Sequence, residues 1–307
     1  MKGLVVNSDK NIVLKANLIR PIVQEGEVLV KVRSASVNIF DAESADGRFD
    51  PYFAEYGVDK EVQTGLEFAG ILESDGQVFK KNDRVFGYVN MITGWKSHAE
   101  YIAIDEDYLA LMPDSSSFSE AAAIPLGAQT ILVALQDLGQ VKPGMKILIN
   151  GAAGGLGIQA VQIGKIIGAH VTAIAGSDQE AYLRSYGADK VYDYNQTKIG
   201  EISDTFDLVL DLTNRQKLED MKGLLTPNGT FIPGEPNEEN GGVLEDSQVG
   251  YLMVAHGDRA KLTQVASWVS EGKLKAVIDS EFSFVEHEQA IARVKEKGRR
   301  GRIVMNW

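Results

Sequence analysis

Hydrophobic positions change their spacing twice between residues 146 and 175 of this chain. Residues 146–149 form a short apolar run, which is typical of a strand buried on both faces. Gly168 predicts the end of a following helix, and residues 171–174 form a second apolar run. The helix itself is indicated by apolar residues at the spacing of one face, at Leu156, Ala160, Ile163 and Ile167. The pattern therefore predicts a strand, a glycine-rich turn, a helix and another strand.

The glycine-rich turn, residues 151–157, predicts a site for a dinucleotide pyrophosphate. The first N–H groups of a helix lack partners in the helix and carry partial positive charge, so a diphosphate suits them. Ala152 stands at the first glycine position of the strict G-x-G-x-x-G pattern, so the motif alone is weak and an ordinary glycine-rich turn is the alternative. The position of the turn between a strand and a helix favours the dinucleotide site. The candidate cofactor-binding residues are Ala152, Ala153, Gly154, Gly155, Leu156 and Gly157, the glycines leaving room for the phosphates and for packing of the helix on the strand.

The rest of the chain shows two patterns. Residues 1 to about 115 consist of short alternating stretches broken by glycines, which predicts a compact β-rich domain. From residue 119 to about 265, strands and helices alternate, and residues 177–180 fit a capping box that would begin one of the helices. The tail, residues 275–307, returns to β character around one helix. Further strands of the alternating part are expected at 190–194, 207–211 and 230–232.

Composition and charge exclude several classes of protein. With 31 Lys and Arg against 43 Asp and Glu the net charge is −12, which argues against a nucleic-acid surface. The basic residues at 295–302 are too few to change this, and a solvated turn is expected there. The chain contains no cysteine, so disulfides are excluded. We expect no membrane partner and a cytoplasmic location, because neither a signal peptide nor a run of membrane-spanning length is found.

Short motifs follow one another along nearly the whole chain, at residues 26–32, 36–41, 65–70, 82–87, 99–101, 151–157 and 187–191. In order and spacing they resemble the medium-chain dehydrogenase/reductase superfamily, and specifically its zinc-independent quinone oxidoreductase branch. The resemblance implies an α/β fold with a GroES-like β-rich catalytic domain, residues 1–118 and 266–307, and a Rossmann domain with a doubly wound parallel sheet, residues 119–265. It also implies a homodimer formed through the edge of the Rossmann sheet.

The resemblance bears directly on metal binding. Zinc-dependent relatives place a cysteine where this chain has Asn38, a histidine where it has Leu66, and a second cysteine near Leu126. None of these residues offers a thiolate or an imidazole, so we expect no catalytic zinc. The hydroxyl that relays a proton in the alcohol dehydrogenases is replaced by Phe40, which relays nothing.

Without a Lewis acid, the expected acceptors are quinones and conjugated enones or alkenals, because delocalisation spreads the charge that arrives with hydride. The resemblance places Asn38, Asp41 and Thr130 near the nicotinamide, where Asn38 would hydrogen-bond the carboxamide, the ribose or a substrate oxygen. The alternative for Asn38 and Asp41 is a turn in which the aspartate accepts backbone N–H groups. Tyr52 is a candidate proton donor, although relatives usually carry a tyrosine where Phe49 stands.

The residues after the second strand favour NADPH over NADH as the cofactor. The strand ends without the acidic residue that would bind the ribose 2′-hydroxyl of NAD. Ser177 could donate to a 2′-phosphate, and the resemblance implies that Tyr194 lines this phosphate. Gly234 is a further cofactor-binding candidate. A lysine common in relatives is replaced near Gln179, which leaves Arg184 as the candidate compensating cation.

Three functions remain compatible with the sequence. The leading interpretation is an NADPH-dependent quinone or enone reductase. A non-catalytic NADPH-binding redox sensor or crystallin-like protein is the second. An enoyl reductase of lipid synthesis is the third, and the acidic composition disfavours it because an acyl carrier would need a basic docking patch.

Overall fold

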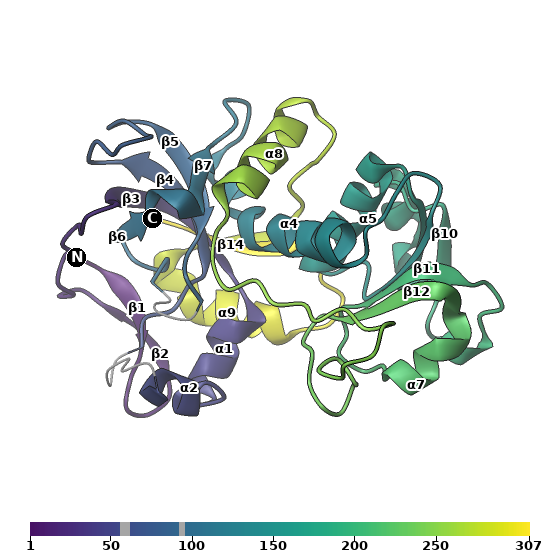
Figure 1. Ribbon diagram of the computed structural model, residues 1–307. Coiled ribbons are helices and arrows are strands. Elements are labelled where there is room, and N and C mark those ends of the chain that lie inside the picture. Colours follow the sequence, from purple (N-terminus) through teal and green to yellow (C-terminus); the bar gives the residue numbers. More distant parts are fainter. Residues whose placement is uncertain (56–61, 92–95) are drawn as a thin grey trace. The chain divides into compact units, whose positions relative to one another are not determined.

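The computed structural model of the protein describes residues 1–55, 62–91 and 96–307, apart from the side chain of Tyr52 (Figure 1). The chain packs into two compact units. Unit 1 comprises residues 1–129 and 255–307, and unit 2 comprises residues 130–254. The division into a catalytic domain, residues 1–118 and 266–307, and a dinucleotide-binding domain, residues 119–265, stays a prediction.

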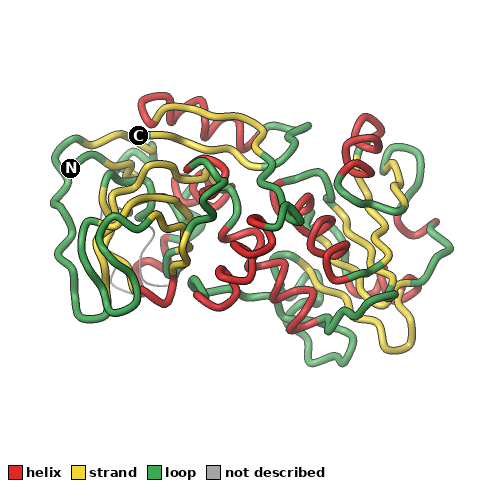
Figure 2. Tube along the Cα trace, turned by 90° about the horizontal axis from the view of Figure 1, so that it is seen from above, coloured by secondary structure: helices red, strands yellow, loops and turns green. Residues whose placement is uncertain are grey.

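Unit 2 is built on a five-stranded sheet in which all neighbouring strands are parallel (Figure 1). Its order, β10-β9-β8-β11-β12, reverses direction beside β8, so the sheet is doubly wound as predicted. In Figure 2 the strands of this unit run together as one layer with helices beside them. The strands are β8 (Lys146–Asn150), β9 (His170–Ala175), β10 (Lys190–Asp193), β11 (Phe206–Asp211) and β12 (Leu225–Pro233), and the connecting helices are α5 (Gly155–Ile167), α6 (Glu180–Ser185) and α7 (Leu218–Met221).

The strand, turn, helix and strand predicted from the spacing of apolar residues are confirmed as β8, α5 and β9. The apolar side chains of β8 are fully buried, as expected for a central parallel strand. Helix α5 ends where Gly168 adopts a left-handed conformation with φ of 93°.

The capping box predicted at residues 177–180 is wrong. Gly176 is the cap, and residues Ser177–Gln179 form a 3-10 turn that precedes α6. Because Ser177 already lies inside this turn, its hydroxyl is not at the cap position that accepts a helix N–H. The side chain of Ser177 is therefore left on the surface at the end of β9.

Unit 1 is the β-rich GroES-like part, with a seven-stranded sheet of order β13-β14-β3-β4-β5-β7 and β6 paired to β3. The long strand β3 organises it, because β3 pairs with β4, β6 and β14 along different parts of its length. The strands of unit 1 are β1 (Gly3–Val6), β2 (Ile12–Lys15), β3 (Glu27–Val37), β4 (Glu67–Leu72), β5 (Arg84–Tyr88), β6 (Tyr101–Asp105), β7 (Leu109–Leu111), β13 (Ile278–Ser283) and β14 (Arg302–Asn306).

Unit 1 also contains helices, which stand before or after its strands along the chain. The helices are α1 (Ile39–Ala45), α2 (Asp50–Glu55), α3 (Phe118–Ala122), α8 (Arg259–Ser270) and α9 (His287–Lys295). Helix α4 (Pro125–Leu132) contains the boundary between the units and continues as a π-helical turn over Val133–Leu138. The predicted C-terminal arrangement of β structure around one helix is confirmed by β13, α9 and β14. Among the described residues, no helix combines the length and apolar character needed to cross a membrane.

A buried carboxylate holds the loop that precedes β5. Glu106 accepts backbone N–H groups from Gln77 at 2.8 Å and from Val78 and Phe79 at 3.0 Å each. Burial opposes the charged form, but these hydrogen bonds and the charge of Arg259 outweigh it and lower the pKa of Glu106. The loop therefore depends on an ionised Glu106.

Glu106→Gln is expected to lower the free energy of unfolding of unit 1 by about 1.5–3 kcal/mol at neutral pH, the worth of hydrogen bonds to a charged group. Because the folded-state pKa is lowered, this contribution is present above the unfolded-state value of about 4.3 and is lost as pH falls through the folded-state value. Residues 130–254, which form unit 2, contain no tryptophan, and Trp268 and Trp307 lie in unit 1, so tryptophan fluorescence in urea reports unit 1. A difference between wild type and variant that stays constant into acid would contradict this account. Exposed Glu25→Gln is the control, with a change below about 0.5 kcal/mol.

Candidate functional site

The glycine-rich turn gives helix α5 an open N-terminus at the carboxyl end of β8. Gly151 turns the chain with φ of 81°, and Gly154 is the N-cap with φ of −70° and ψ of 177°. No side chain caps the helix. Its first N–H groups therefore have the arrangement that binds an anion such as a diphosphate.

Two glycines of the turn differ in the space around them. A Cβ atom at Gly157 would lie 2.2 Å from the carbonyl oxygen of Gly151, so only glycine lets the helix pack against the turn. A Cβ atom at Gly154 would meet nothing closer than the Gly151 oxygen at 3.5 Å. Space therefore remains beside Gly154, where a ligand would approach the helix.

Asp211, which the sequence analysis did not single out, ties together the strand ends at the point where the sheet reverses direction. The amide of Asn150, at the end of β8, donates to its carboxylate at 2.9 Å. The same carboxylate accepts N–H groups of Thr213 at 3.0 Å and Gln216 at 3.0 Å, and the N–H of Gly234 donates to its carbonyl oxygen at 2.8 Å. The predicted residue Gly234 thus lies at the end of β12 beside the ends of β8 and β11. An acid directly after the apolar run of β11 was the available signal for Asp211.

Ser177 and Tyr194 are brought together at the end of β9. Ser177 is exposed, and Tyr194 is 62% exposed with its N–H donating to Ala175 at 3.1 Å. A Cβ atom at Gly176 would lie 3.3 Å from the Tyr194 hydroxyl, which places that hydroxyl beside the residue preceding Ser177. Two exposed residues with hydroxyl groups therefore lie at the end of β9, and their contact with a 2′-phosphate stays a prediction.

The side chains of Gln179 and Arg184 are used within the protein. Gln179 is buried and donates to the carboxylate of Asp178 at 3.1 Å. Arg184 donates to Glu180 at 2.8 Å and to the carbonyl oxygen of Asp189 at 2.9 Å. Arg184 therefore stabilises its own helix and strand, and it is not placed as the compensating cation.

In unit 1, Asp41 forms the turn that was the alternative to a catalytic role. Its carboxylate accepts the N–H of Asn38 at 2.8 Å and the N–H of Gly65 at 2.7 Å, and the residue is fully buried. The ring of buried His98 lies 4.0 Å away and is itself bonded to Thr64 at 2.9 Å. Asp41 thus joins the start of α1 to the segment before β4.

Asn38 lies in a buried polar group with Glu67 and Arg302. Arg302 donates to the Asn38 oxygen at 2.8 Å and forms an ion pair with Glu67. Asn38 donates to Glu67 at 3.4 Å, and the N–H of Leu126 donates to the second Glu67 oxygen at 2.8 Å. Burial lowers the pKa of Arg302 to about 10, against the opposing charge of Asp41, so the guanidinium is charged at neutral pH.

The solvated turn predicted for residues 295–302 is wrong at its last residue. Arg302 is only 6% exposed because it begins β14, the strand that pairs with the end of β3. Sequence reasoning counted this arginine with its exposed basic neighbours and missed its pairing with Glu67. The signal was a charged residue at the entrance to the apolar run 303–305.

The other candidate residues are placed as follows. Thr130 lies on α4 and is buried, as the first residue of unit 2. The side chain of Tyr52, on α2, lies outside the described part of the structure. Leu66 and Leu126, at positions where zinc-dependent relatives carry ligands, are both buried. Within residues 1–55, 62–91 and 96–307, no three His, Cys, Asp or Glu residues are grouped so as to hold a metal ion.

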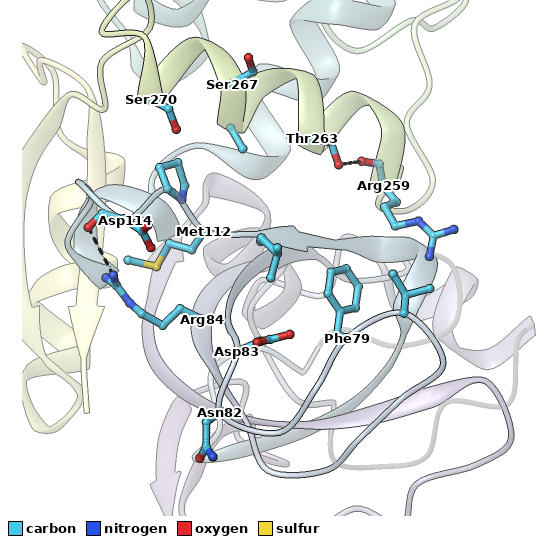
Figure 3. A pocket seen from close by; sticks show the side chains of 14 residues that line it. Phe79, Asn82, Asp83, Arg84, Met112, Asp114, Arg259, Thr263, Ser267 and Ser270 are labelled. Carbon is cyan, nitrogen blue, oxygen red and sulfur yellow. Dashed lines mark hydrogen bonds between the residues drawn. The ribbon is translucent and has the colours of Figure 1, made fainter.

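A pocket of about 740 Å³ opens elsewhere in unit 1, lined by the connection between β4 and β5, by β7 and by α8 (Figure 3). None of the candidate site residues lines it. Arg84 donates to the carbonyl oxygens of Asp114 at 3.4 Å and Ser116 at 2.7 Å, and Arg259 pairs with Asp107 at 3.0 Å. The guanidinium groups of both arginines that line the pocket are therefore engaged within the protein.

Two family models match the chain. One, the alcohol dehydrogenase GroES-like domain, matches residues 24–114, and the other, zinc-binding dehydrogenase, matches residues 186–305. Among relatives, a 2-methylene-furan-3-one reductase of Solanum lycopersicum is 30% identical over 95% of this chain and 75% of its own length. An NADPH-dependent alkenal/one oxidoreductase of Arabidopsis thaliana, named as chloroplastic, is 28% identical over the same shares.

Solved structures share the fold over almost their whole length. A quinone oxidoreductase from Coxiella burnetii has a TM-score of 0.87 and 24% identity, and covers 100% of this chain and 99% of its own. The CurK enoyl reductase has a TM-score of 0.84 and 25% identity, with 99% of each chain covered.

Proposed function

Because the chain belongs to the medium-chain dehydrogenase/reductase superfamily, an oxidoreductase family, we propose that it transfers hydride from NADPH to a quinone or a conjugated enone or alkenal without a metal ion. The observation that carries the proposal is the uncapped start of α5 beside Gly154, at the point where the parallel sheet reverses direction. Ligands of doubly wound folds bind at such points.

The residues of the turn fit a dinucleotide. The backbone of residues 152–157 would hold the pyrophosphate, with the room beside Gly154 taken by its oxygens. Ser177 and Tyr194 would contact the 2′-phosphate through their hydroxyl groups. Thr130 and Gly234 complete the proposed set. When bound, the reduced nicotinamide supplies the hydride, and the protein supplies its orientation.

The class of hydride acceptor is inferred from the residues of unit 1 that stand at the metal-ligand positions of zinc-dependent relatives. Asn38, Leu66 and Leu126 offer no thiolate or imidazole to a metal ion, so a hydrogen bond rather than a Lewis acid would stabilise the oxygen that gains charge. Conjugated carbonyl compounds need less stabilisation than isolated ketones, because their charge is delocalised. Asn38 is the proposed donor, Asp41 positions it through the turn, and Tyr52 or water supplies the proton.

One alternative activity has a specific observation in its favour. Similarity to the CurK enoyl reductase supports reduction of an acyl-linked enoyl group. This substrate is also a conjugated carbonyl compound, so the same chemistry applies to it. The alternative without turnover, a sensor or crystallin-like protein, uses the same cofactor site.

Assembly and location belong to the proposal as well. Four exposed apolar residues follow the edge strand β12, which supports a homodimer through this edge: Val243, Leu244, Tyr251 and Met253. We propose a cytoplasmic location for this chain, while relatives are named as chloroplastic and mitochondrial proteins.

The proposal is tested by mixing the purified protein with NADPH or NADH and a panel of quinones, 2-alkenals and enoyl thioesters, and following nicotinamide absorbance. We expect oxidation of NADPH with a quinone or alkenal, and a lower kcat/KM with NADH. Preference for the thioester would instead support the enoyl reductase alternative. Tight binding of NADPH without turnover on any acceptor would contradict the enzymatic proposal, and a preference for NADH would contradict the roles of Ser177 and Tyr194.

A further inference from the structure

The side-chain amide of Asn38 is held between a group that only donates hydrogen bonds and a group that only accepts them. The donor is the Arg302 guanidinium, 2.8 Å from the Asn38 Oδ1 atom. The acceptor is the Glu67 carboxylate, 3.4 Å from the Asn38 Nδ2 atom. Asn38 is 5% exposed, Arg302 is 6% exposed and Glu67 is fully buried.

These partners determine which end of the amide faces which way. A guanidinium has no acceptor atom, and an ionised carboxylate has no donor. Turning the amide over would set its NH₂ group against the guanidinium and its oxygen against the carboxylate. Both contacts would be repulsive and buried from water, so a single orientation is stable.

The fixed orientation leaves one N–H of the Asn38 NH₂ group available to donate a hydrogen bond. One N–H faces Glu67, and the second N–H has no partner among the described residues. The backbone N–H of Asn38 is also used, because it donates to Asp41. What Asn38 offers to a ligand is therefore an N–H donor.

We infer that Glu67 and Arg302 are positioning residues that fix Asn38 as a hydrogen-bond donor to the carbonyl oxygen of the acceptor. The inference rests on the proposed function. Of the three partners considered for Asn38, which were the nicotinamide carboxamide, the ribose and a substrate oxygen, it selects the substrate oxygen. Glu67 is itself held by the N–H of Leu126 at 2.8 Å, so the ion pair is anchored to the main chain as well as to Arg302.

The donor acts where negative charge develops. When the β-carbon of an enone takes up hydride, a C–H bond forms, the C=C π bond breaks, and the electron pair moves to the carbonyl oxygen. The cofactor is oxidised by two electrons, and one proton from water or a side chain then completes the saturated carbonyl product. The Asn38 N–H stabilises the oxygen during the first of these events, as oxyanion donors do.

A double-mutant cycle separates positioning from general damage. Asn38→Ala is expected to lower kcat about 100-fold, as removal of an oxyanion donor does. Arg302→Lys retains the charge opposite Glu67 but loses the guanidinium fork that holds the Asn38 oxygen. It is expected to lower kcat about 10-fold in the wild-type background and less than about 2-fold in the Asn38→Ala background, with KM for NADPH unchanged in both. Equal losses in the two backgrounds would overturn the inference.

Arg299→Lys is the matched control, because Arg299 lies in the connection just before β14 and, among the described residues, donates to the carbonyl oxygen of Glu296 at 3.1 Å and not to Asn38 or Glu67. Its kcat should equal that of wild type. If wild type itself shows no turnover, the proposed function fails and the inference is tested by NMR of protein labelled in asparagine side chains. The signal of the Asn38 N–H that faces Glu67 should then be protected from exchange with water in wild type and in Arg299→Lys, and lose protection in Arg302→Lys. Equal protection in Arg302→Lys would overturn the inference.

Discussion

Glu67→Ala is expected to lower the free energy of unfolding of unit 1 by about 3–5 kcal/mol, the cost of leaving a buried charge without its partner. The variant strands the Arg302 guanidinium, which is 6% exposed, and removes the acceptor of the Leu126 N–H. Relaxation or water entry would recover only part of this cost. Urea unfolding followed by tryptophan fluorescence measures the loss in unit 1 alone, since residues 130–254 of unit 2 contain no tryptophan.

The control for this variant is another glutamate close in sequence. Glu73 pairs with Arg20 at 3.8 Å at the protein surface, where ion pairs contribute about 0–1 kcal/mol. Glu73→Ala should therefore change stability by no more than that. If Glu67→Ala costs no more than Glu73→Ala, the buried pair does not hold the start of β4 against β14.

Gly154→Asp is expected to weaken NADPH binding at least about 100-fold while leaving the protein folded. The loss corresponds to two charge-assisted hydrogen bonds at roughly 1.5 kcal/mol each. A Cβ atom fits at this position, and aspartate is a favourable N-cap that suits the positive end of a helix. The new carboxylate therefore stabilises α5 but occupies and repels the site of the phosphates.

Gly154→Asn provides the matched comparison, because asparagine has nearly the same shape and also caps helices but carries no charge. Binding is measured by nicotinamide fluorescence, and folding of unit 2 by circular dichroism. We expect Gly154→Asp to bind more weakly than Gly154→Asn at low salt, and the difference to shrink as salt is added. Wild-type affinity in Gly154→Asp would show that the turn is not the pyrophosphate site.

The parallel sheet was predictable because its signals are local. The apolar run of β8, the helical spacing in α5 and the glycine at 168 each act within a few residues, and all three were confirmed. The capping box at Ser177 failed for an equally local reason. A 3-10 turn begins at Ser177, the residue that was predicted to be the cap, so the cap lies one residue earlier, at Gly176. Helix propensity does not distinguish such a turn from the first turn of an α-helix.

The buried group around Asn38 was only half predictable. Asn38 and Asp41 are close in sequence, so their turn was weighed as an alternative to a catalytic role. Glu67 and Arg302 are separated by more than two hundred residues and meet only because β14 pairs with β3 and β3 pairs with β4. Sequence distance hides such a pair, and an arginine in a basic stretch is indistinguishable from its exposed neighbours until the strand register is known.

The most direct test of metal-free hydride transfer uses NADPH that carries deuterium at the hydride-donating carbon. The protein is first dialysed against a chelator, its metal content is measured, and a 2-alkenal or quinone that supports turnover is added. With a 2-alkenal, we predict that the deuterium appears at the β-carbon of the reduced product, at the same rate before and after chelation. With a quinone, whose product carries the transferred atom on exchangeable O–H groups, we predict that the rate of NADPH oxidation is the same before and after chelation. Deuterium transfer that stops on chelation and returns with zinc, or NADPH oxidation that leaves no deuterium in the alkenal product, would contradict the proposed function.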